Sequence, residues 1–406
     1  MEQEQGATAT TSAPREAALS ASTERRVGKT TITGGGGRLT RPPSSEHHCE
    51  DGKKRHEKAQ ASDIDLSQLQ QQLTGLRGVW QAASGTTLPT SRSSDKIQSS
   101  HRPTGKMKVE AASTRKSLLG EGPHWDERNS TLLMVDALGR EVVRYDPSCG
   151  TESQVIRTEG DLGNVIPFAD DNRQVALCME QGLYRLNLDT HQKELLVEML
   201  DPESPVKSRL NDGKCDALGR LWTGSMPSTG VQNVIPGKNN FWCYSKGKLQ
   251  HKLDGVTLSN GITWTTDNRV MFYDDSVPGQ IYAFDFDLTA GEISNRRLLA
   301  DFSTTPGYEG LGVPDGMTID LNNKIWVACF GGSAVVQIDP ETAKILTKIS
   351  FPAKYTTSCC FGGKNYDVLY VTTGSFRPDA TRPEDGLLYR VTELGAKGKA
   401  AYEFAG

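Results

Sequence analysis

The sequence of 406 residues has no long apolar run and no strong excess of charge of either sign. The lack of about 18 consecutive apolar residues argues against a transmembrane helix, so we expect no membrane partner. The formal net charge of −4 is too close to neutral for a general nucleic-acid binder, a class that usually carries a strong basic excess. The first residues, MEQEQGATATTSAPRE, contain no apolar signal segment. We therefore expect a cytoplasmic protein, with the nucleus as a further location.

The sequence also lacks regular cysteine spacing and, in its second part, a GxSxG motif. Most of the eight cysteines lie inside apolar runs such as VALCME and WVACFGG. In a protein without a signal segment this pattern predicts reduced, buried thiols, including the adjacent pair Cys359 and Cys360. The missing GxSxG motif argues against a serine-esterase triad.

The chain divides by composition into residues 1–106 and residues 107–406. The first part is rich in Ser, Thr, Gly, Gln and charge and has few aromatic residues. Such a segment buries too little apolar surface to offset its ordering entropy, so we predict a mostly disordered extension. Within it, residues 62–76 carry leucines at helical spacing. A transient helix is the simpler interpretation, and docking of a protein partner is the alternative.

Residues 107–406 repeat a pair of short strand-like runs about every 42 to 54 residues. This is the period of a propeller blade with four strands, and six units fill the region. We therefore predict an all-β fold, a six-bladed β-propeller in which one blade takes strands from both ends of the domain. A pair of β-sandwiches is the alternative. The first run of each pair is TLLMVDA, QVALCM, RLWTGSM, VMFYDDS, KIWVACF or VLYVTTG.

Four of these units share a polar residue directly before a glycine and just ahead of a strand-like run. We expect each glycine to allow a tight turn, so that the polar side chain is held at the start of a strand, where a propeller aims side chains into its channel. Oxygen donors suit Ca²⁺, Mg²⁺ or Mn²⁺ better than a dedicated zinc site. Each residue alone is commonly a turn former, and only the joint pattern indicates ligation. The four pairs are Glu121-Gly122, Asp212-Gly213, Asn260-Gly261 and Asp315-Gly316.

Several motifs in fixed order, from Met107 to Gly406, resemble the regucalcin family, which includes the gluconolactonases and luciferin-regenerating enzymes. The motifs are GEGPHW, RLNDGKCDALGRLWTGSM, LSNGITW, VPDGMTID and YTTSCCFGGKNY. The likeness is strongest to the animal regucalcins. It implies a six-bladed propeller with one divalent cation (Ca²⁺, Zn²⁺, Mg²⁺ or Mn²⁺) in its channel.

The resemblance also implies roles for single residues. Glu121, Asn260 and Asp315 match the family's metal ligands, Arg209 and Asn211 match its substrate contacts, and Asp315 matches its acid–base residue. The implied substrate is a small lactone. One family substrate contact, a glutamate shortly after the segment that reads GSM here, is replaced by the acid-free PSTGVQ. The implied preference for sugar lactones is weakened by that difference.

Two functions therefore follow from the sequence. The first is a metal-dependent lactonase in which a cation polarises the lactone carbonyl and a carboxylate takes the proton of the attacking water. The second is a non-catalytic calcium-binding regulator that keeps the propeller and the cation. We interpret Asp212 as a structural turn residue and His124 as a packed histidine whose hydrogen bonds are satisfied.

Overall fold

The computed structural model describes residues 107–230 and 234–406 of the chain. Two predictions from the sequence, the disordered extension over residues 1–106 and the helix over residues 62–76, lie outside the described residues. Within the described part of the chain, no helix is long and apolar enough to cross a membrane.

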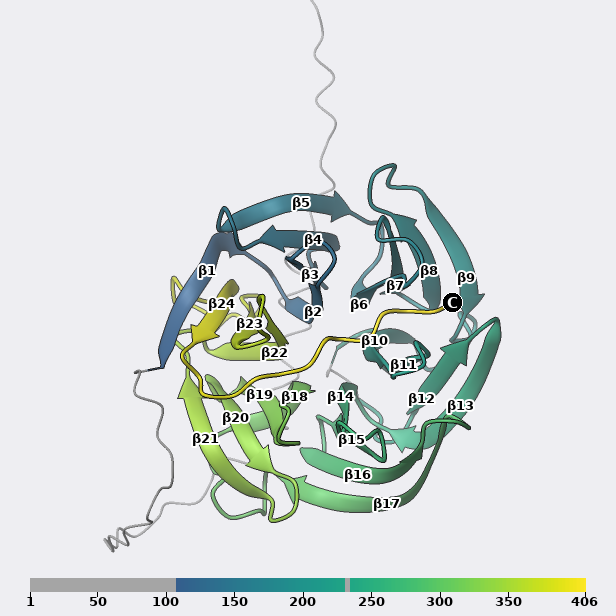
Figure 1. Ribbon diagram of the computed structural model, residues 1–406. Coiled ribbons are helices and arrows are strands. Elements are labelled where there is room, and N and C mark those ends of the chain that lie inside the picture. Colours follow the sequence, from purple (N-terminus) through teal and green to yellow (C-terminus); the bar gives the residue numbers. More distant parts are fainter. Residues whose placement is uncertain (1–106, 231–233) are drawn as a thin grey trace, which may run out of the picture. The chain divides into compact units, whose positions relative to one another are not determined.

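The described residues form six antiparallel sheets of four strands each, arranged as blades around a central axis (Figure 1). The predicted six-bladed β-propeller is therefore confirmed, and the sandwich alternative is excluded. Blades 1 to 3 contain β2 (Gly120–Asp126), β3 (Thr131–Asp136), β4 (Glu141–Asp146) and β5 (Thr151–Arg157); β6 (Leu162–Pro167), β7 (Gln174–Met179), β8 (Gly182–Asn187) and β9 (Lys193–Glu198); and β10 (Ser208–Cys215), β11 (Leu221–Pro227), β12 (Asn239–Ser245) and β13 (Lys248–Val256). Blades 4 to 6 contain β14 (Ser259–Trp264), β15 (Val270–Asp275), β16 (Gln280–Asp287) and β17 (Glu292–Asp301); β18 (Gly312–Ile319), β19 (Ile325–Gly331), β20 (Ala334–Asp339) and β21 (Lys344–Ser350); and β22 (Tyr355–Gly362), β23 (Val368–Gly374), β24 (Leu387–Thr392) and β1 (Lys108–Lys116).

Burial falls from the axis to the rim of every blade. The inner strands, β2, β6, β10, β14, β18 and β22, are almost wholly buried, and each touches the inner strands of the two neighbouring blades. The outer strands alternate between exposed and partly buried residues, as in β5 and β21. The sequence follows this gradient, because second strands such as TLLMVD and QVALCM are almost continuously apolar. The hydrophobic core therefore lies between the faces of neighbouring blades.

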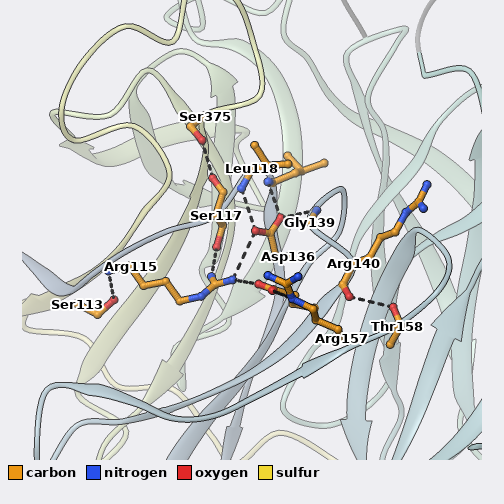
Figure 2. A network of polar contacts seen from close by, with 12 residues as sticks. Ser113, Arg115, Ser117, Leu118, Asp136, Gly139, Arg140, Arg157, Thr158 and Ser375 are labelled. Atoms are coloured by element: carbon orange, nitrogen blue, oxygen red, sulfur yellow. Dashed lines mark hydrogen bonds and ion pairs between the residues drawn. The ribbon is translucent and has the colours of Figure 1, made fainter. Parts of the chain in front are cut away.

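Blade 6 closes the ring by taking its outer strand from the start of the domain, since β1 pairs with β24. Figure 2 shows how the segment after β1 is then tied to blade 1. Asp136 accepts hydrogen bonds from the backbone N–H groups of Leu118 and Leu119 at 2.9 and 3.0 Å. Arg115 forms ion pairs with Asp136, at 3.7 Å, and with Glu141. The predicted completion of one blade from both ends of the domain is confirmed.

The last residues, 393–406, form a segment that we call the C-terminal strap. It crosses one end of the ring (yellow in Figure 1). Backbone hydrogen bonds join the strap to several blades, at the end of the channel where the inner strands finish. These bonds are Leu321 N to Lys397 O (2.8 Å), Gly398 N to Tyr366 O (2.8 Å), Phe404 N to Pro167 O (2.9 Å), Ala405 N to Gly219 O (2.9 Å) and Lys246 N to Gly406 O (2.6 Å). The strap therefore links distant blades and covers this end.

The seven cysteines in the described residues are free thiols, as predicted. All are buried except Cys149, which is exposed. The adjacent pair Cys359 and Cys360 lies within the buried strand β22, as the sequence indicates.

We expect the strap to be a major source of stability, because Phe404 is fully buried against Phe168 and Tyr244. Phe404→Ala should lower the free energy of unfolding by about 3–5 kcal/mol, the usual cost of emptying a core aromatic site. Urea unfolding of the full chain measures it. Leu298→Ala, at a position that is 56% exposed, is the matched control and should change stability by less than about 0.5 kcal/mol. A loss below about 1 kcal/mol for Phe404→Ala would show that the strap is dispensable.

Candidate functional site

Every inner strand breaks register with the second strand of its blade, and each break begins within the first three residues of the inner strand. The breaks fall between Glu121 and His124 in β2, Leu162 and Val165 in β6, Leu210 and Gly213 in β10, Ser259 and Ile262 in β14, Pro314 and Met317 in β18, and Thr356 and Ser358 in β22. A β-bulge of this kind redirects a side chain that would otherwise follow the pleat. The repeat of the break explains how polar residues from separate blades reach one level of the axis.

We predicted that the glycines of the repeated pairs form tight turns ahead of strands. This prediction is wrong. Gly213, Gly261 and Gly316 lie inside β10, β14 and β18. A Cβ atom on Gly261 would lie 2.6 Å from the carbonyl oxygen of Asp315, and one on Gly316 would lie 1.9 Å from Ser358 Oγ. These positions need glycine because the inner strand of the next blade lies against them.

The two acidic residues predicted to bind the cation are buried and incompletely hydrogen-bonded. Glu121 is 8% exposed and Asp315 is 5% exposed. Among the described residues, Glu121 Oε2 and Asp315 Oδ1 have no hydrogen-bond partner. Burial, together with the charges of Asp315 and Asp212, raises the pKa of Glu121 well above its usual range. Burial and the charges of Asp274 and Asp212 likewise raise the pKa of Asp315. The negative charges of neighbouring acidic side chains therefore add to the effect of burial on both carboxyl groups.

A chain of hydrogen bonds joins the other three predicted residues. Asn211 Nδ2 donates to Asn260 Oδ1 at 3.0 Å and to the carbonyl oxygen of Ser259 at 2.8 Å. Arg209 Nη1 donates to Asn211 Oδ1 at 3.3 Å and to the carbonyl oxygen of Leu210 at 2.9 Å. Burial lowers the pKa of Arg209, whereas the negative charges of Asp161, Glu180 and, least of the three, Glu121 favour the charged guanidinium. The five predicted residues therefore fall into two connected groups on β2, β10, β14 and β18.

Three further polar residues were missed or interpreted differently from the sequence. Asp212, interpreted as structural, does accept a hydrogen bond from its neighbour Gly213 at 2.7 Å, but its charge also acts on both Glu121 and Asp315. Asn164 of β6 donates to the carbonyl oxygen of Asn211 at 2.8 Å. It follows a glycine, Gly163, instead of preceding one, so the repeated pair did not reveal it. A search for one polar residue in each of the six inner strands would have found Asn164.

His124, the third of these residues, is buried, as predicted, but it is not satisfied. Its Nε2 atom has no hydrogen-bond partner within residues 107–230 and 234–406. Burial lowers the pKa of His124 to about 4, so the imidazole is neutral near pH 7. Its ring therefore presents an unused nitrogen to the channel interior.

The donors at the site fit a hard divalent cation. Glu121 and Asp315 each offer a buried oxygen without a hydrogen-bond partner in the described residues, which is costly in the absence of a compensating charge. Asn260 is held from both sides, since its Nδ2 donates to Ser276 Oγ at 2.8 Å while its Oδ1 accepts from Asn211. In the described part of the chain, no three His, Cys, Asp or Glu side chains form a metal cluster. The third protein ligand predicted from the sequence is the amide oxygen of Asn260, a donor type that hard cations accept.

Comparisons with known proteins agree with the resemblance seen in the motifs. Residues 119–375 match the family described as the SMP-30/Gluconolactonase/LRE-like region. The regucalcin of Danio rerio is 36% identical over 304 residues, which cover 74% of this chain and 99% of that protein. A solved luciferin-regenerating enzyme superposes with a TM-score of 0.69 at 31% identity, over 74% of this chain and all of that one. A structure of a calcium-binding protein, regucalcin, from Agrobacterium tumefaciens gives a TM-score of 0.66 at 22% identity, over 73% of this chain and 97% of that one, which shows the shared fold.

The buried carboxyls predict that Asp315→Asn stabilises the cation-free protein, and increasingly so at higher pH. In the unfolded chain Asp315 ionises near its ordinary pKa of 3.8, whereas the folded state resists ionisation because its pKa is raised. The resulting loss of folding stability in the wild type is absent below about pH 4, grows as the pH rises, and is complete above the pKa of Asp315 in the folded state. It amounts to about 1.4 kcal/mol for each tenfold difference between the folded and unfolded acid dissociation constants. Urea unfolding of demetallated protein at pH 4.5 and pH 8 measures it.

The control for this experiment is Asp189→Asn, since Asp189 is an exposed residue on the rim. It should leave stability within about 0.5 kcal/mol of the wild type at both pH values. An Asp315→Asn advantage of equal size at pH 4.5 and pH 8 would contradict a raised pKa at this position.

Proposed function

Because the chain belongs to the SMP-30/gluconolactonase/LRE-like family, we propose that it is a divalent-cation-dependent lactonase. The observation that carries the proposal is the pair of buried carboxyl oxygens on Glu121 and Asp315 that have no hydrogen-bond partner in the described residues. A bare carboxylate pair in a low-dielectric channel is unfavourable by itself, and a cation offsets both charges at once. The fold alone would not support the proposal, because propellers host many activities.

Glu121, Asn260 and Asp315 would hold the cation, which supplies Lewis-acid polarisation of the lactone carbonyl when bound. Their oxygen donors favour Ca²⁺, Mg²⁺ or Mn²⁺, and the family resemblance leaves Zn²⁺ as a further choice. Dialysed protein reloaded with each metal in turn would rank them by the increase in melting temperature.

Asp315 would act as the general base. A carboxylate within hydrogen-bond reach of the attacking water can accept its proton. It would take a proton from the attacking water as the new C–O bond forms at the carbonyl carbon. The ring C–O bond would then break, and the proton held by Asp315 would pass to the departing ring oxygen. The product is an open-chain hydroxy acid.

Arg209 and Asn211 would position the lactone. Arg209 is 3% exposed and is fixed to the wall through its Nη1 atom, so its other guanidinium nitrogen would donate to a substrate oxygen. Asn211 is fixed through Nδ2 to the next blade, so its Oδ1 lies beside the guanidinium. Side chains held by protein partners are pre-organised, which lowers the entropic cost of orienting a substrate.

A calcium-binding regulator without turnover is the second candidate function. It is favoured by the absence of an acid in the segment PSTGVQ, where the resembling family has a substrate-contacting glutamate. The name regucalcin, carried by the relatives, and the calcium binding ascribed to one solved structure point the same way. The cytoplasmic or nuclear location and a protein partner for residues 62–76 stay predictions.

Lactone hydrolysis, followed with a pH-indicator dye, tests the proposed function. With gluconolactone and a panel of other small lactones, the rate should fall to background when a chelator is added and return when excess Ca²⁺, Mg²⁺, Mn²⁺ or Zn²⁺ is restored. A rate that does not respond to the chelator would overturn the proposal. Calcium binding by calorimetry without turnover of any lactone would support the regulator instead.

Replacing the proposed base separates catalysis from folding. Asp315→Asn should lower kcat by about 10²–10⁴-fold, the range typical of general acid–base and metal-assisted steps, while the circular dichroism spectrum is unchanged. Asp189→Asn is the matched surface control and should keep wild-type kcat. Full activity in Asp315→Asn would remove this residue from the mechanism.

A further inference from the structure

Two small cavities follow one another along the axis below the candidate site. The upper cavity is lined by Gly122, Asp212 and Ser358 among others, and it adjoins the carboxylates described above. The lower cavity is bounded by residues of the inner strands and by residues 399–402 of the C-terminal strap. Pro123, His124 and Lys214 line both cavities. The lower cavity is thus an inner chamber between the site and the strap.

Lys214 separates the two cavities because its side chain spans the channel. It begins on β10 in blade 3, and its Nζ donates to the carbonyl oxygen of Met317 on β18 in blade 5, at 2.6 Å. Lys399 of the strap reaches in from below, with Nζ at 3.4 Å from the carbonyl oxygen of Trp264. Each ammonium therefore has a carbonyl partner that supplies a dipole but no negative charge.

The lining of the lower cavity is rich in nitrogen donors. Besides Lys214 and Lys399 it includes His124 and Trp264. His124 Nε2 and the indole N–H of Trp264 are both buried and have no hydrogen-bond partner in the part of the chain that the structure describes. His124 is 5% exposed and Trp264 is 2% exposed. The indole N–H lacks an acceptor, and the imidazole nitrogen donates as well in the tautomer that carries its proton on Nε2.

The charge in the lining of the lower cavity is positive, and the two acidic side chains that act on its ammonium groups, Asp212 and Asp267, lie outside that lining. Among the described residues its lining contains no Asp or Glu, whereas Asp212 lines only the upper cavity. Burial lowers the pKa of Lys399 to about 8, helped by the positive charge of Lys214, with Asp267 acting weakly in the opposite direction. Two ammonium groups that repel each other at one small cavity are stabilised by an anion between them.

We propose that the lower axial cavity is a binding site for one small monovalent anion of halide size, held by Lys214, Lys399, His124 and Trp264. The small size of the cavity favours a single compact ion over a phosphate or a carboxylic acid. The anion accepts hydrogen bonds from the ammonium groups and from the neutral donors. Since one of its ligands lies on the strap and the others on the inner strands, the anion fastens the strap to the ring.

A halide titration of the full chain, made cation-free so that the candidate metal site does not contribute, tests the site. Thermal unfolding is followed as sodium chloride or bromide replaces sodium methanesulfonate at constant ionic strength. The melting temperature should rise and saturate with halide, as expected for binding to the folded state alone. In Lys399→Met that rise should be lost. Lys397→Met, an exposed lysine on the same strap, is the matched control and should keep it.

An equal halide response in Lys399→Met and Lys397→Met, or no saturable response in the wild type, would overturn the proposal. Should Lys399→Met fail to fold, crystals of the wild type grown in bromide give an independent answer. The bromide anomalous peak is expected in the lower cavity, beside Lys214 and Lys399. A cavity occupied by water alone, with bromide elsewhere or nowhere, would refute the site.

Discussion

The close packing of the six inner strands around one axis is the constraint on which the rest of the structure depends. Neighbouring strands approach so closely that positions such as Gly261 and Gly316 have no space for a Cβ atom. The strands meet this constraint by breaking register near their first residues, and the bulges turn polar residues of separate blades toward the axis. The candidate site thus results from ring closure and not from any local motif. The pairing of β1 with β24 completes the last blade of that ring.

Charge is distributed unevenly along this axis. Acidic side chains, among them Glu121, Asp212 and Asp315, gather on the inner strands near the register breaks, where burial raises the pKa of each and makes the ionised form unfavourable. Lys214 and Lys399 lie lower, toward the strap. An arrangement with unlike charges at two levels suits a cation above and an anion below, each of which relieves a charge that the protein alone leaves poorly compensated.

Much of the fold and part of the site could be predicted from the sequence, for identifiable reasons. Apolar runs such as TLLMVD and KIWVACF recur at the period of a blade, and burial between blades requires that pattern. Glu121, Asn260 and Asp315 stood out because each precedes a glycine at the same phase of the repeat. The glycines were predicted to form turns, whereas they make room for the neighbouring inner strand. A sequence does not show which strand lies against a given residue. Asn164 could not be predicted from this pattern, because its glycine comes before it and not after it. Its side chain nevertheless contacts β10, the inner strand of the next blade.

Repeated local patterns predict the number of blades and most of the polar residues of the candidate site, and the order of several motifs predicts the family. The tertiary structure alone sets which atoms face each other across the channel. It made His124 a buried nitrogen without a hydrogen-bond partner in the described residues, and it brought the strap residue Lys399 beneath Lys214, 185 positions earlier in the chain. Such contacts form because the blades close into a ring around one axis. The number of residues between two positions in the sequence does not show how far apart they lie across that axis.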